Sequence, residues 1–177
     1  RMLLRAQDGR ERAIAVDLKA PEGAEILRSL VKGADVLIEN FRTGTMESFG
    51  LGYDALSAIN PSLIYCSISA FGRTGPRKDG AGYEALMQAF SGIMSITGEP
   101  DGPPVRAGVS FLDLTTGIFS AFGIVNALLH RAKTGVGQRV DGSLLETAVT
   151  LLNYHAEGFL LTGAEPKALG SSHPSLA

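Results

Sequence analysis

Residues 13–39, AIAVDLKAPEGAEILRSLVKGADVLIE, carry the pattern on which the fold prediction rests. Its first part, Ala13–Leu18, is short, β-rich and alternating, which predicts a strand. Pro21 then occupies a favourable first helical position, and the apolar residues that follow have helical spacing. Gly33 ends this helix, and Asp35–Glu39 predicts a second strand. The order strand, helix, strand indicates a parallel βαβ unit.

The same alternation continues along the chain. Gly- and Pro-rich stretches at 72–82 and 98–108 predict loops. The other predicted elements are helix Tyr53–Ile59, strand Leu63–Ile68, helix Tyr83–Ile96, a helix from about Leu114 to Lys133, a short strand ending at Val140 and a helix from Ser143 to about Leu161. Glu146, three residues after Ser143, fits a capping box at the start of the last helix. The expected fold class is α/β, with a parallel sheet and flanking helices.

The predicted helix Leu114–Lys133 has a distinct apolar pattern and a clear end. Its basic last turn is followed by Gly135 and Gly137, as at many helix C-termini. The apolar residues that fall on one face of it are Leu114, Ile118, Phe122, Val125 and Leu129.

Composition excludes several classes of protein. The 177 residues contain a single cysteine, Cys66, which excludes a disulfide scaffold. A net charge of −2 gives no basic surplus for nucleic acid, and 45% hydrophobic residues with 19% charged residues argue against disorder. The longest apolar runs are shorter than the ~18 residues of a membrane span. We expect a soluble, globular, cytoplasmic protein, or a mitochondrial matrix protein if a presequence has been removed.

Common catalytic and ligand motifs fit the chain poorly. Gly50-x-Gly52-x-x-Ala55 has the spacing of a dinucleotide fingerprint, but no buried strand precedes it and no acidic residue follows about 20 positions on. His130, His155 and Cys66 lack metal-ligand spacing, so no metal site is predicted. The chain has no G-x-S-x-G nucleophile elbow.

Asp113 is the carboxylate to which the sequence gives two compatible interpretations. It stands between the apolar pair Phe111-Leu112 and a long helix, so it could be an N-cap that accepts a backbone N–H from Thr115 or Thr116. It could also be a nucleophile, because a carboxylate at a helix N-terminus is held ionised by the dipole and lies beside N–H groups able to stabilise an oxyanion.

Several motifs together resemble one enzyme family. They follow one another in order over essentially the whole chain, with matching spacing: Glu39-Asn40-Phe41-Arg42-x-Gly44, Gly50-Leu51-Gly52-Tyr53, Asn60-Pro61-x-Leu63-Ile64-Tyr65, Gly82-Tyr83, Ser95-Ile96-Thr97-Gly98, Asp101-Gly102-Pro103-Pro104, Asp113-Leu114-Thr115-Thr116-Gly117 and Thr134-Gly135-x-Gly137-Gln138-x-Val140-Asp141. In these motifs the chain resembles the class III coenzyme A transferases, the family of formyl-CoA transferase and carnitine CoA-transferase.

The resemblance implies a fold and an assembly. It implies that residues 1–177 are a central segment of the family's Rossmann-like large domain, with the start of the chain, the smaller domain and the C-terminal part lying outside it. Family members form interlocked dimers, so a homodimer is expected.

The resemblance also implies a chemistry. Asp113 would attack an acyl-CoA thioester to give a mixed anhydride, and an aspartyl-CoA thioester would follow. Related α-methylacyl-CoA racemases keep a histidine where this chain has Tyr83, and a phenol is a poor base at neutral pH, which favours transfer over racemisation. Tyr83 resembles the tyrosine of the transferases. Its structural alternative is an aromatic residue at a helix start, packed on the core.

For coenzyme A, the resemblance puts Val16, Lys19, Asn40 and Phe41 at contact positions. CoA and its thioesters would be substrates, with small carboxylates as co-substrates and with no prosthetic group. Neither nucleic acid nor a membrane is expected as a partner. Two alternatives to transfer stay open, an acyl-CoA racemase or epimerase and a CoA-binding module without turnover. The loop Gly72–Gly82 could help to close the site or be an ordinary surface loop.

Overall fold

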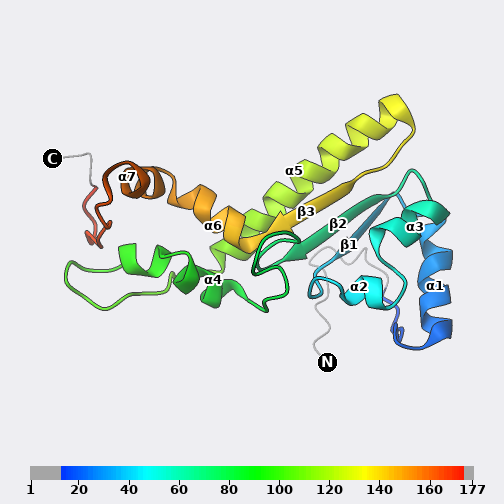
Figure 1. Ribbon diagram of the computed structural model, residues 1–177, viewed down its shortest axis with the longest axis horizontal. Coiled ribbons are helices and arrows are strands. Elements are labelled where there is room, and N and C mark those ends of the chain that lie inside the picture. The colour runs from blue at the N-terminus through cyan, green and yellow to red at the C-terminus, as the bar shows by residue number, and fades with distance from the viewer. Residues whose placement is uncertain (1–12, 174–177) are drawn as a thin grey trace.

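The structure, a computed structural model, describes residues 13–173 and shows a parallel sheet with helices packed around it (Figure 1). In chain order the elements are α1 (Pro21–Val31), β1 (Val36–Glu39), α2 (Thr45–Ser48), α3 (Tyr53–Ile59), β2 (Ile64–Ser69), α4 (Glu84–Phe90), the 3-10 helix η1 (Ile93–Ile96), α5 (Phe111–Thr134), β3 (Arg139–Ser143), α6 (Leu144–Leu152) and α7 (Tyr154–Thr162). The expected α/β class is confirmed, and the helices predicted at Pro21 and at Tyr53–Ile59 begin where expected.

The sheet has the strand order β1-β2-β3, and both pairs of strands are parallel. Glu39 at the end of β1 is level with Ser67 of β2, and Ser69 at the end of β2 is level with Ser143 of β3. The three strands therefore end at one edge of the sheet, where open α/β sheets bind their ligands.

Two apolar clusters hold the helices in place. Helices α1, α2 and α3 lie together at one end of the molecule and α4, α6 and α7 at the other (Figure 1). The first cluster consists of Ala24, Val31, Met46, Leu51, Leu56, Leu63 and Tyr65. The second consists of Ala70, Met87, Ile93, Leu112, Leu144 and Ala148. Because Ala70 directly follows β2, the second cluster fixes α4 and the start of α5 beside the strand ends.

Helix α5 packs on the sheet through its small residues. Its buried side chains are Leu112, Thr116, Ser120 and Ala127. A Cβ on Gly142 of β3 would lie 2.6 Å from the Ser120 Oγ, and one on Gly123 would lie 2.8 Å from a Val140 methyl group. Helix and sheet are therefore too close for large side chains to fit between them.

The apolar stripe of α5 lies on the other face and is exposed. A stripe with this spacing usually marks the side of a helix that packs on the core. Here its side chains retain 53–68% of their accessible surface, and they are Leu114, Ile118, Phe122, Val125 and Leu129. By length and composition alone, α5 is the one helix in residues 13–173 that could cross a membrane, which is weak evidence for a span.

The strand predicted at Ala13–Leu18 is wrong. Residues 13–17 have no regular secondary structure, Ile14 is exposed, and β1 pairs only with β2 among the described residues. The segment ends in a turn, because the Asp17 carbonyl accepts the Ala20 N–H at 3.2 Å and the Asp17 carboxylate accepts the Lys19 N–H at 3.0 Å. The alternating pattern cannot form a strand without a neighbouring strand to satisfy its backbone groups.

Two predicted helices are each interrupted. The helix expected at Tyr83–Ile96 ends at Phe90, because Gly92 takes a φ of 87°, and η1 follows it. The helix expected from Ser143 divides into α6 and α7 at Asn153, whose φ is 45°. The predicted cap of α6 is confirmed, since the Ser143 Oγ accepts the Glu146 N–H at 3.2 Å. Val140 lies within β3 and does not end it.

Candidate active site

The loop after β1 is held by a buried carboxylate. Glu39, the last residue of β1, is buried, and its Oε2 accepts the backbone N–H of Phe41 at 2.8 Å. This hydrogen bond fixes how the chain turns at Asn40 and Phe41, directly beyond the end of the strand.

Arg73 ties this loop to the loop after β2. Its guanidinium donates to the Ser67 Oγ of β2 at 3.1 Å, forms an ion pair with Glu47 and lies 3.9 Å from a carboxylate oxygen of Glu39. Thr43 adds a hydrogen bond of 3.4 Å from its Oγ1 to the Gly72 carbonyl. The two loops that follow neighbouring strands therefore form one connected unit.

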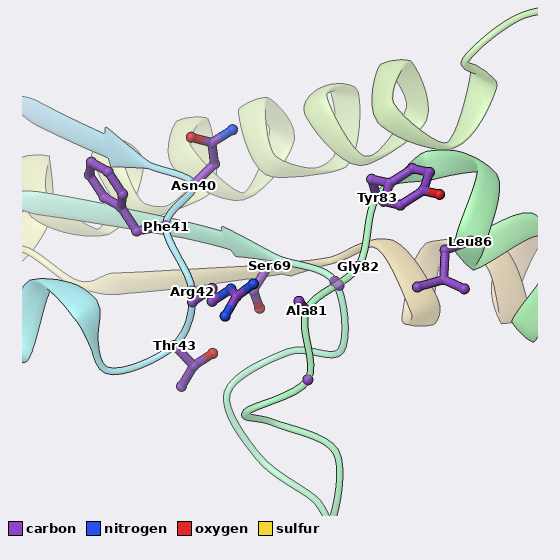
Figure 2. Close-up of a pocket in the computed structure, with 11 residues that line it drawn as sticks. Asn40, Phe41, Arg42, Thr43, Ser69, Ala81, Gly82, Tyr83 and Leu86 are labelled. Carbon is purple, nitrogen blue, oxygen red and sulfur yellow. The ribbon is translucent and has the colours of Figure 1, made fainter.

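A pocket of about 510 Å³ opens between these loops and the start of α4 (Figure 2). We call it the Phe41 pocket. Asn40, Phe41, Arg42 and Thr43 come from the loop after β1, whereas Gly82, Tyr83 and Leu86 come from the start of α4 and the residues before it. The pocket combines an aromatic ring, a guanidinium group and amide and hydroxyl groups.

A second pocket of about 410 Å³ adjoins the first, and we call it the Asp113 pocket. Asn40, Ser69, Ala70, Gly82 and Tyr83 line both pockets. The side chains found only in the Asp113 pocket are Ile68, Glu84, Asp113, Thr116 and Leu144, together with Gly117. The structure therefore brings Asn40, Tyr83 and Asp113 around one opening, as the predicted geometry requires.

Asp113 is not the N-cap that the sequence suggested. Helix α5 begins two residues earlier, at Phe111, with Ser110 as its N-cap, so Asp113 is the third helical residue. The Asp113 carboxylate is therefore not needed to cap the start of the helix, and it lines the pocket.

The electrostatic environment of Asp113 also differs from the expectation. A helix dipole favours the charged carboxylate at this position. Partial burial and the nearby Glu84 carboxylate nevertheless raise the pKa of Asp113 above its usual value. The site therefore provides a carboxylate that is partly desolvated and close to a second negative charge, which makes it more basic than an ordinary aspartate.

Tyr83 lies in the opening and not in the core. It is the N-cap residue of α4, and its side chain is 70% exposed. The structural alternative, an aromatic residue packed on the core, is therefore wrong. Figure 2 shows Tyr83 and Thr43 at opposite sides of the pocket.

Gly82 permits the close packing that positions Tyr83. A Cβ on Gly82 would lie 2.7 Å from the Ala70 Cβ and 2.9 Å from the Met87 Cε. We predict that Gly82→Ala lowers the free energy of unfolding by about 1–3 kcal/mol, because residue 82 must move away from β2. Gly117→Ala is the matched control, since a Cβ there meets no atom within 4 Å and alanine favours the helix. Chemical denaturation measures both, and equal stability of the two variants would contradict this prediction.

The structure does not bring the other two predicted contact residues into either pocket. Val16 and Lys19 lie in the segment before α1 and line neither the Phe41 pocket nor the Asp113 pocket. Their role toward CoA stays a prediction from the family resemblance.

Two charged residues of the pockets were not singled out from the sequence. Arg42 lines the Phe41 pocket and Glu84 lines the Asp113 pocket. Arg42 could have been found, because it follows Asn40 and Phe41 in the same motif just beyond a strand end. Glu84 could not, because a carboxylate in the first turn of a helix is ordinarily exposed, and only the fold buries this one.

Cys66 is a weak candidate for a second reactive group. Burial raises the pKa of the Cys66 thiol, which disfavours the thiolate. Within residues 13–173, no three His, Cys, Asp or Glu residues are grouped so that they could hold a metal ion. A site for a metal is therefore not indicated in the described part of the chain.

Comparison with known proteins identifies the family of the chain. Residues 5–177 match the family model described as CoA-transferase family III. The chain belongs to this family. It is 47% identical over 167 residues to a succinate–glutarate CoA-transferase of Agrobacterium fabrum and 42% identical over 166 residues to the mouse succinyl-CoA:glutarate CoA-transferase. A crystal structure of a CaiB/BaiF family protein from Brucella suis has 46% sequence identity to this CoA-transferase family III chain, with a TM-score of 0.87.

The chain spans only part of these relatives. Each alignment covers 94% of the chain but 42% of the Agrobacterium enzyme, 38% of the mouse enzyme and 44% of the Brucella protein. The matched segment of the family III fold includes the strand ends, the start of α4 and the start of α5, which together form the two pockets.

Proposed function

We propose that the protein containing this chain transfers coenzyme A from an acyl-CoA donor to a carboxylic acid, with Asp113 as the nucleophile. The observation that carries the proposal is the pair of joined pockets, in which Asp113 shares one opening with Asn40 and Tyr83. A thioester bound there has a carboxylate within the same cavity, and the CoA moiety has a neighbouring pocket to occupy.

The proposed reaction begins with attack on the donor. The Asp113 carboxylate attacks the thioester carbonyl carbon and forms a mixed anhydride, while the C–S bond breaks and CoA leaves as a thiolate. The thiolate then attacks the aspartyl carbonyl carbon of the anhydride, which forms aspartyl-CoA and releases the donor acid. A thiolate leaves readily because the pKa of a thiol is near 8.5.

The second half of the reaction reverses these steps with the acceptor. The acceptor carboxylate attacks the aspartyl-CoA carbonyl carbon and displaces the thiolate, which forms a new anhydride. The thiolate attacks the acceptor carbonyl carbon of that anhydride, and this step yields the product thioester and restores Asp113. The first N–H groups of a helix have no partner within the helix, so those of α5 can donate to the oxygen on which negative charge develops.

Binding of CoA would use the Phe41 pocket. The Arg42 guanidinium can form charge-assisted hydrogen bonds with a phosphate, the Phe41 ring can pack on an apolar part of the ligand and Asn40 can bond an amide. The two relatives carry succinate, succinyl-CoA and glutarate in their names, so we propose short dicarboxylates as the substrate class. A homodimer and a cytoplasmic location also remain predictions.

The function is tested by assaying the complete protein against a panel of donors and acceptors. Succinyl-CoA, acetyl-CoA and glutaryl-CoA are each incubated with succinate, glutarate or a monocarboxylate, and the thioesters formed are identified by mass spectrometry. Appearance of glutaryl-CoA from succinyl-CoA and glutarate supports the proposal. Release of free CoA without any new thioester in every combination contradicts it.

Tyr83 separates transfer from racemisation. We predict that Tyr83→Phe lowers transfer by no more than about tenfold, because the phenol is exposed in the pocket and hydrogen-bonds substrate without moving a proton from carbon. We also predict that the unaltered protein does not exchange the α-proton of a 2-methylacyl-CoA in deuterated water. Deuterium incorporation in the absence of an acceptor acid, detected by mass spectrometry, would favour the racemase alternative.

A further inference from the structure

Glu84 places a buried carboxylate in the wall of the Asp113 pocket. It is the first residue of α4, and only 5% of it is accessible. Burying a carboxylate is costly unless hydrogen bonds and a counter-ion compensate for the lost water. The groups that compensate the Glu84 charge therefore determine what this residue can do.

The partners of Glu84 link two segments of the site. The Gln88 Nε2 donates to the Glu84 Oε1 at 2.5 Å, one turn along α4, and the Arg106 guanidinium lies 3.4 Å from the Glu84 Oε2. Gln88 is fully buried, and its Oε1 accepts the backbone N–H of Ala107 at 2.9 Å. The segment that these bonds hold, Arg106–Ala107, leads directly into α5.

This network connects the two residues proposed to meet the substrate. Tyr83 directly precedes Glu84, and Asp113 lies in the first turn of the helix that follows Ala107. The bonds from Glu84 through Gln88 to Ala107 therefore join the start of α4 to the start of α5. A small movement between two such elements would change the position of a nucleophile relative to bound substrate, which can reduce rate by orders of magnitude.

We propose that Glu84 is a positioning residue for Asp113. Through Gln88 and Arg106, Glu84 holds the starts of α4 and α5 together, and it places a second carboxylate in the wall of the Asp113 pocket. This inference rests on the proposed function, because it concerns the same carboxylate.

The electrostatic part of the proposal has a definite sign. Burial raises the pKa of Asp113, and the Glu84 charge raises it further. Among the residues lining the Asp113 pocket, the titratable groups are Tyr83, Glu84 and Asp113, and Arg106 faces Glu84 from the preceding segment. The charged side chains of β3 and α6 that pack near α5, Asp141 and Glu146, line a different cavity. Substitutions of Glu84 and Arg106 therefore test the electrostatic part of the proposal.

Two variants should move the pH profile in opposite directions. Glu84→Gln keeps an acceptor for Gln88 but removes a negative charge, so the pKa of Asp113 falls and the acid limb of kcat/KM moves to lower pH. Arg106→Gln removes the counter-ion but keeps the Glu84 carboxylate, so the acid limb moves to higher pH. Arg106 is 42% exposed at its side chain and lies outside the core, so this second variant tests the proposal even if Glu84→Gln folds poorly.

The positioning part has its own variant. Gln88→Met has nearly the same volume and keeps the Glu84 carboxylate, but it removes both hydrogen bonds of the bridge, to Glu84 and from Ala107. We expect kcat to fall about tenfold or more at a pH where Asp113 is ionised, because the helix starts are no longer held together. A change in KM alone would overturn this part, since a residue that only shaped the binding pocket would affect substrate affinity.

The measurement is kcat/KM for CoA transfer against pH in the complete protein, with Glu22→Gln as a control for loss of one acidic residue. Circular dichroism and thermal denaturation establish that each variant is folded. Acid limbs that coincide with that of the unaltered protein in both Glu84→Gln and Arg106→Gln overturn the inference. Transfer that is absent, or that Asp113→Asn performs as fast, overturns the proposed function and is thereby distinguished from failure of the inference alone.

Discussion

Asp113→Asn should abolish CoA transfer, lowering kcat by about 10³-fold or more, because the amide oxygen cannot act as the nucleophile that forms the anhydride. Asparagine preserves the size of the side chain in an exposed position of the first turn of α5, so the folded structure should persist. Stopped assays of thioester exchange in the complete protein measure the loss. Asp54→Asn, at an exposed position of the first turn of α3, is the control.

A covalent intermediate gives an independent check on the same residue. Incubation of the unaltered protein with acyl-CoA and then hydroxylamine should convert Asp113 to its hydroxamate, which peptide mass spectrometry identifies. Labelling of another carboxylate, or near-normal turnover by Asp113→Asn, would refute the proposed mechanism.

Arg73→Met should give the largest loss of stability, about 3 kcal/mol in the free energy of unfolding. It removes the hydrogen bond to Ser67 and leaves the buried carboxylate of Glu39 without its cation. The exposed partner Glu47 adds little to this figure, because surface ion pairs are weak. Denaturant unfolding of the complete protein measures the change.

The same substitution should also weaken CoA binding, because Arg73 joins the loops that form the Phe41 pocket. Lys78→Met, an exposed cation in the same loop, should change neither stability nor binding. If Arg73→Met is as stable as Lys78→Met, the ion-pair network does not hold the loops.

The local pattern of the chain was enough to predict most of the elements near the site. Pro21 begins α1, Tyr53–Ile59 forms α3, and Ser143 caps α6 as expected, because each depends on residues within one or two turns. The pattern did not predict where two of the helices are interrupted. The positive φ at Gly92 and Asn153 shortens two predicted helices, and a helical pattern of side chains does not reveal where a backbone turns.

The site could be predicted only in part. The motifs identified Asn40, Tyr83 and Asp113, and parallel strand ends predicted one common edge for ligand binding. The raised pKa of Asp113 was not predictable, because it depends on the partial burial of Asp113 and on Glu84, a residue 29 positions away whose burial requires the packing of α4 against α5. Proximity between distant segments is a property of tertiary structure, and charges interact through space.

Local patterns were enough to predict the alternation of strands and helices from β1 onward, the parallel arrangement of those strands and the apolar stripe on α5. Which face of α5 is buried depends on how the helix packs on the sheet. Periodicity shows that Leu114, Ile118 and Phe122 share a face, but packing against β3 requires close approach, and the small residues of the opposite face satisfy that requirement. The helix therefore buries Thr116 and Ser120 against the sheet and leaves its large apolar side chains exposed, because a side chain's burial depends on the space between elements as well as on its hydrophobicity.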